Sequence, residues 1–128
     1  MQQHTIKDVY LIHHSHTDVG YTDLQEQVIY NQAHNIKRAV QLISDGKKNN
    51  TPERELKWNC ETWYCVEQFL KMASEDEQES FWDLVRTGSI GLSATYLNSN
   101  DLTDCRYLSK KIAEMKECCQ NNGVSLET

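Results

Sequence analysis

The chain has 128 residues, of which 38% are hydrophobic and 25% charged, as in an ordinary globular protein. One proline, five glycines and no biased tract argue against a disordered chain. The length predicts a single domain, residues 1–128, with one core. The formal net charge of −6 argues against nucleic acid as a partner, because phosphate binding requires a basic face.

The N-terminal segment and the cysteines indicate the compartment. The stretch "MQQHTIKDVYLI" fits neither a signal peptide nor a membrane span, and no later run approaches about 18 apolar residues. The five cysteines are odd in number and form no CxxC motif, so we expect reduced, packing thiols. We therefore expect a cytoplasmic protein that binds no membrane.

The first half of the chain predicts a strand followed by a helix. The apolar, β-rich run Asp8–Ile12 is typical of a buried parallel strand. Thr22 and Asp23 are placed to cap a helix, whose apolar face runs over Leu24–Ile43 and which Gly46 would end.

The second half continues this alternation. A weak strand is expected at Glu55–Cys60, followed by two helices at Trp63–Ala73 and Ser74–Val85. A third strand is expected at Ser89–Leu97 and a last helix at Cys105–Cys119. Ser74 with Glu77 forms a capping box for the third helix.

Alternating strands and helices predict right-handed βαβ units around a parallel sheet. Such a sheet is usually covered on both faces, and three strands leave unpaired edges. We therefore expect an α/β fold of alternating βα units that is the opening section of a larger domain, with self-association through the exposed sheet edges.

Histidines and aspartates gather directly after the first expected strand, in "HHSHTDVGYTD", His13–Asp23. Binding groups in parallel α/β sheets lie beyond the carboxyl ends of the strands. If the chain stays extended there, His14, His16 and Asp18 point the same way. Imidazole nitrogen with carboxylate oxygen suits zinc, so the string predicts half of a metal site. The alternative is that the histidines are hydrogen-bonded loop residues and Asp18 is a cap.

The string "HSHTDVGY", residues 14–21, resembles the zinc-binding opening motif of glycoside hydrolase family 38, the α-mannosidase family. In that family an apolar strand ends in His-x-His-x-Asp-x-Gly-aromatic. The likeness extends more loosely through "WNCETWYCVEQFL" and "GSIGLSATYLNSNDL". Val19 and Tyr21 stand where many members have proline and tryptophan, and this form is closer to divergent bacterial members.

The resemblance implies an incomplete β/α barrel with one zinc ion at its mouth. His16 and Asp18 would be two zinc ligands, His14 would orient His16, and Tyr21 would lie near the sugar. The implied reaction is retaining hydrolysis of an α-mannosidic bond in a mannoside or related oligosaccharide, by a carboxylate nucleophile and an acid/base carboxyl.

Both catalytic carboxyls and the remaining zinc ligands are expected beyond Thr128. The resemblance thus implies the N-terminal part of an enzyme, inactive alone, with zinc bound weakly or not at all.

Three further residues are candidates for substrate or supporting contacts. Glu61 follows the second expected strand, and Asn100 and Asp101 follow the third, near Asn98. Each also fits a structural role, as an acid at a helix start or as a turn or cap residue. Two other functions stay open: a non-catalytic metal- or carbohydrate-binding module, and a plain α/β interaction domain with structural histidines.

Overall fold

The computed structural model describes residues 6–98 and 104–125. Over these residues the chain forms four α-helices, one short 3-10 helix and two three-residue strands, and helices account for 59% of them. The prediction of alternating βα units that open a barrel is therefore wrong.

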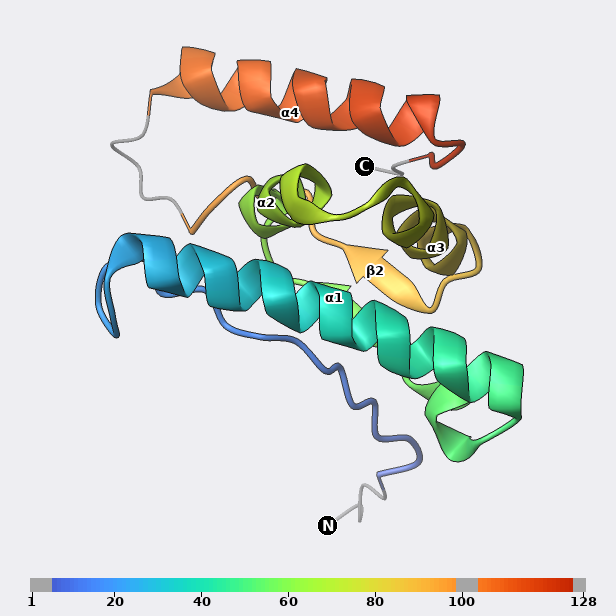
Figure 1. The fold of residues 1–128 in the computed structure, drawn as a ribbon. Helices are drawn as coiled ribbons and strands as arrows, with labels where there is room; N and C mark the ends of the chain where they lie inside the picture. The colour runs from blue at the N-terminus through green and yellow to red at the C-terminus, as the bar shows by residue number, and fades with distance from the viewer. Residues whose placement is uncertain (1–5, 99–103, 126–128) are drawn as a thin grey trace, which may run out of the picture.

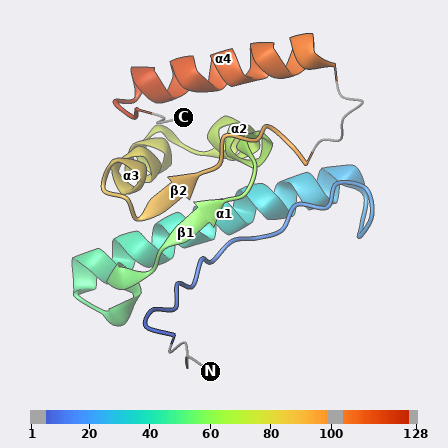
Figure 2. The ribbon, with the colours of Figure 1, turned by 180° about the vertical axis from the view of Figure 1, so that it is seen from behind.

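The described elements follow one another as α1 (Gln25–Asn49), η1 (Pro52–Glu55), β1 (Trp58–Cys60), α2 (Trp63–Met72), α3 (Glu75–Arg86), β2 (Ile90–Leu92) and α4 (Cys105–Asn121). The α2–α3 pair lies between α1 and α4 (Figures 1 and 2). The small sheet lies beside this pair, and the N-terminal segment runs past β1 toward the start of α1 (Figure 2).

The first expected strand does not form. Within the described residues this segment pairs only at His13, which bridges to Trp58 and whose carbonyl accepts the Asn59 N–H at 2.8 Å. Residues 9–12 are each between 72% and 85% exposed. A buried parallel strand needs partners along its length and cover on both faces, and apolar composition alone supplies neither.

The other two expected strands form, but each is cut to three residues. β1 and β2 pair in parallel with Trp58 opposite Ile90 and Asn59 opposite Gly91. A Cβ on Gly91 would lie 2.8 Å from Asn59 Oδ1, so this position has no room for a side chain. Helices, rather than the sheet, therefore supply most of the core.

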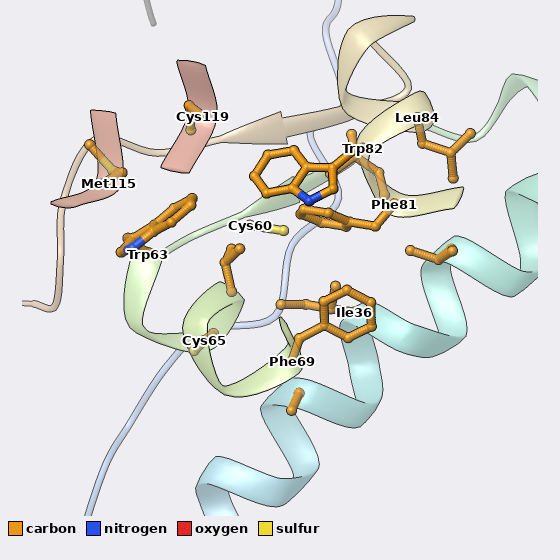
Figure 3. Close-up of a cluster of buried hydrophobic side chains, with 14 of the residues drawn as sticks. Ile36, Cys60, Trp63, Cys65, Phe69, Phe81, Trp82, Leu84, Met115 and Cys119 are labelled. Carbon is orange, nitrogen blue, oxygen red and sulfur yellow. The ribbon is translucent and has the colours of Figure 1, made fainter. Parts of the chain in front are cut away.

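The core lies where α1, α2, α3 and the sheet meet. Phe81 is fully buried, and its ring centroid lies 5.1 Å from those of both Phe69 and Trp82. Met115 and Cys119 reach the same cluster from α4 (Figure 3). The apolar spacing of three and four residues predicted these buried helix faces.

Both predicted ends of α1 are wrong. The N-cap is Leu24, without a side-chain cap bond, and Asp23 Oδ1 accepts only the Leu24 N–H. The helix continues through Gly46 to Asn49, and Asn50 takes the left-handed conformation with φ 57°. Gly46 serves close packing instead, because a Cβ there would lie 2.7 Å from the carbonyl carbon of Glu53 in η1.

The capping box of α3 is confirmed. Ser74 Oγ accepts the Glu77 N–H at 3.3 Å, and Glu77 Oε2 accepts the Ser74 N–H at 3.1 Å. Replacing Ser74 with alanine should lower the free energy of unfolding by about 1 kcal/mol, since one orphan donor loses its acceptor. Urea denaturation measures this loss. Ser109→Ala, on the exposed surface of α4, is the control, and an equal effect of both changes would contradict the cap's role.

Candidate metal-binding site

Glu61 fixes the loop that carries the histidine string. It follows β1 directly, and its two carboxylate oxygens bind different parts of the loop. His16 Nδ1 donates to Oε1 at 2.7 Å, and the backbone N–H of Thr17 donates to Oε2 at 2.6 Å. An ionised carboxylate only accepts hydrogen bonds, so Nδ1 carries the hydrogen and Nε2 faces away from Glu61.

Asp18 lies on the other side of the His16 ring. Its Oδ1 is 3.2 Å from His16 Nε2. Two donors on a tetrahedral zinc ion, with bonds of about 2.0–2.1 Å, lie about 3.3 Å apart. The pair therefore has the spacing of two ligands of one cation, and the same spacing suits a hydrogen bond when Nε2 carries a proton.

The electrostatics of the site favour an ion pair in the absence of metal. The hydrogen bond to Glu61, followed by the charges of Glu61 and Asp18, raises the pKa of His16 above its ordinary value. Partial burial would raise the pKa of Glu61, but the hydrogen bonds from His16 and the Thr17 backbone, with the His16 charge, lower it overall. Both shifts indicate an imidazolium held by a carboxylate.

The loop backbone is held by polar side chains that the sequence analysis did not single out for this role. Gln32 of α1 donates to the His16 carbonyl at 2.7 Å, and Asn98 donates to the Thr17 carbonyl at 3.2 Å. Thr17 itself is buried, with its hydroxyl 3.4 Å from the Cys65 thiol. These bonds tie the loop to α1, to α2 and to the segment after β2. Asn98 therefore positions the loop.

The remaining candidates lie at the rim. His14 Nδ1 is 3.7 Å from Glu61 Oε1, which is too far for a hydrogen bond. Tyr21 is 90% exposed. A cavity of about 270 Å³ opens beside it, lined by Thr17, Asp18, Val19, Tyr21, Leu97 and Asn98. Asn100 and Asp101 lie outside the described residues.

The described residues bring together two side chains of the kinds that bind zinc. His16 Nε2 and Asp18 Oδ1 have the spacing of two ligands of one cation, and Glu61 binds the other ring nitrogen, as the carboxylate does in carboxylate–histidine–zinc triads. No group of three or more His, Cys, Asp or Glu side chains that could hold a metal ion occurs in residues 6–98 and 104–125. The donor chemistry therefore fits zinc, while the donor number is half of a tetrahedral set.

In the parts of the chain that the structure describes, no helix combines the length and apolarity needed to cross a membrane.

Comparison of the chain with protein-family models, with curated proteins and with solved structures finds no match. The likeness to the α-mannosidase family therefore stays a prediction that rests on the motif.

Proposed function

We propose that this chain is the N-terminal part of a zinc-dependent retaining glycoside hydrolase of the α-mannosidase type, acting in the cytoplasm. The observation that supports it best is the 3.2 Å separation of His16 Nε2 and Asp18 Oδ1, with Glu61 on the opposite ring nitrogen. In this proposal His16 and Asp18 are the two zinc ligands that this chain contributes. The proposal does not include the barrel architecture, which the helical fold contradicts.

Each residue at the site has a defined task in this proposal. Glu61 keeps the lone pair of His16 Nε2 aimed at the cation position, and His14 adds a second imidazole beside the same carboxylate. Bound zinc would supply Lewis acidity toward the sugar hydroxyls and a template for the ring. The cavity between Tyr21 and Asp18 suits one sugar ring of a mannoside, with the aromatic face available for its C–H groups.

The bond-breaking groups are assigned elsewhere. Retaining hydrolysis needs two carboxyl groups about 5–5.5 Å apart, one as nucleophile and one as acid and then base. We place both outside these 128 residues and expect the chain alone to have no hydrolase activity.

Zinc titration by calorimetry tests the metal half of the proposal. With two of four ligands, the wild-type chain should hold zinc at most weakly, and His16→Ala/Asp18→Ala should abolish the binding that calorimetry detects. The control His34→Ala/Asp45→Ala removes the same two residue types from exposed positions on α1 and should leave binding unchanged. Equal heats from all three proteins would mean that this chain alone does not hold zinc and serves only as scaffold.

A second candidate is a non-catalytic metal- or carbohydrate-binding module. The helical fold and the two-donor shell favour it, because the module needs neither a barrel nor a nucleophile. Both candidates predict zinc binding and contact with methyl α-mannoside by saturation-transfer NMR. Only the hydrolase predicts turnover of an aryl α-mannoside by a gene product that includes this chain.

A further inference from the structure

Helix α4 is the least buried of the four α-helices that the structure describes. Of its 17 residues, only Met115 and Cys119 are buried, and both reach the core cluster (Figure 3). Tyr107 and Ile112 of the same helix are exposed. Most helical stability in proteins comes from packing of an apolar face. We therefore expect α4 to open at a lower free energy than the helices that it covers.

A polar cluster holds α4 on α2 and on the segment after β2. Lys111 of α4 donates to Glu67 Oε1 of α2 at 3.2 Å, and the Tyr96 hydroxyl donates to Glu67 Oε2 at 3.1 Å. Lys111 Nζ also lies 5.0 Å from the centroid of the Tyr96 ring, within the range of a cation–π contact. The side chains of Lys111 and Glu67 are 19% and 18% exposed, so salt screens this pair less than a surface pair.

Tyr96 lies in a short segment, residues 95–98, that also reaches the loop of the candidate metal site. Tyr96 itself is buried under α4. Two residues further on, the Asn98 amide donates to the Thr17 carbonyl at 3.2 Å. One segment therefore contacts α4 at one residue and the loop at another.

The same segment contacts the residue that holds the histidine ring. The Thr95 hydroxyl donates to the Glu61 carbonyl at 3.2 Å. The carboxylate of Glu61 in turn accepts hydrogen bonds from His16 Nδ1 and from the Thr17 N–H. A movement of residues 95–98 would thus disturb both supports of the loop, the Glu61 backbone and the Thr17 carbonyl.

We propose that α4 is a latch on this loop. When the Lys111–Glu67–Tyr96 cluster is closed, residues 95–98 hold Glu61 and Thr17 in place. When α4 opens, the cluster breaks and the loop is released with it, although no side chain of the candidate site has changed. The inference goes beyond the proposed function, because the loop is held or released whether or not zinc binds.

Amide hydrogen exchange, followed by NMR in EDTA, tests this latch. Where exchange follows opening equilibria, the amide of Met115 reports on α4, that of Thr17 on the loop, and that of the fully buried Ile43 of α1 on the whole fold. In the wild type, Met115 and Thr17 should exchange faster than Ile43. Lys111→Met should speed exchange at Met115 and Thr17 by a similar factor, at least ~tenfold, because a charged hydrogen bond is lost. Exchange at Ile43 should stay unchanged.

Two further variants separate the latch from simpler effects. Lys110→Met is the matched control, since the Lys110 side chain is 73% exposed and pairs with Glu114, which Lys111 also contacts. It should leave all three exchange rates unchanged. Asn98→Ala removes the contact between the segment and the loop, so in that background Lys111→Met should speed Thr17 exchange by a much smaller factor.

Three results would overturn the proposal. Equal opening at Met115 and Ile43 in the wild type would mean that α4 opens only when the whole chain unfolds. Faster exchange at Met115 with unchanged exchange at Thr17 in Lys111→Met would mean that α4 opens without moving the loop. An undiminished effect of Lys111→Met on Thr17 in the Asn98→Ala background would mean that residues 95–98 do not couple the two.

Discussion

Truncation of Phe81 to alanine should lower the free energy of unfolding by about 3–5 kcal/mol, as expected for loss of a fully buried aromatic ring. Phe81 is 0% exposed and contacts Phe69 of α2 and Trp82 of its own helix. Removing the ring loses its transfer free energy and leaves a cavity between α2 and α3. Large aromatic neighbours cannot fill that cavity without leaving their own contacts.

Urea denaturation followed by circular dichroism measures the effect. Total stability of small domains is about 5–15 kcal/mol, so Phe81→Ala threatens folding altogether. Phe81→Leu retains more of the volume, and its smaller loss keeps the comparison measurable. Tyr30→Ala removes a ring that is 50% exposed and should cost much less. Equal losses at positions 30 and 81 would show that this core does not carry the fold.

The helices were predictable because their signals are local. Apolar spacing marked the buried faces of α2 and α3, and the Ser74–Glu77 box marked the start of α3. In α4 the same spacing was right only for Met115 and Cys119, because Cys105 and Ile112 are exposed. Each signal lies within a few residues of the structure that it specifies, since helix hydrogen bonds join residues four apart.

The first strand and the end of α1 depend on contacts that are distant in sequence. Residues 8–12 have the composition of a buried strand, but burial requires strands and covering layers that composition does not encode. Gly46 was interpreted as a stop, while it is in fact the point where η1 packs on α1. The sequence does not distinguish a glycine that ends a helix from a glycine that lets another segment pack closely against the helix.

The proximity of His16 and Asp18 could be predicted from the sequence, whereas the side chains that hold their loop in place could not. His16 and Asp18 lie two residues apart, so their proximity follows from local geometry. Glu61 lies 45 residues from His16, and the position of β1 brings the two together. Gln32 and Asn98 carried no specific signal for the loop, because amide side chains that bind backbone carbonyls show no spacing pattern.

Glu61→Gln should lower the pKa of His16 toward its ordinary value of 6.5, because the hydrogen bond to Glu61 is the largest cause of the raised pKa. A raised histidine pKa stabilises the fold fully below 6.5, and this contribution disappears as the pH rises through the raised pKa. The lowered Glu61 pKa stabilises the fold above 4.5, and this contribution disappears as the pH falls through the lowered pKa. The pair should therefore stabilise the wild type most between pH 4.5 and 6.5.

Zinc binding to the same variant gives an independent measurement. Zinc and the proton compete for His16 Nε2, so wild-type zinc affinity should rise with pH through the raised pKa. Glu61→Gln should weaken zinc binding by about 10–100-fold at high pH, where the imidazole is neutral in both proteins. The pH dependence of its remaining affinity should shift downward with the histidine pKa.

NMR titration of the His16 ring and calorimetry at several pH values measure both effects, with Glu79→Gln as an exposed control. A fall in pKa without loss of zinc affinity would show that Glu61 pairs with the imidazolium but does not orient a metal ligand. An unchanged pKa would mean that Glu61 does not hold the ring in solution. The geometry that supports the zinc proposal would then be lost, because nothing else on the described residues fixes which nitrogen of His16 faces Asp18.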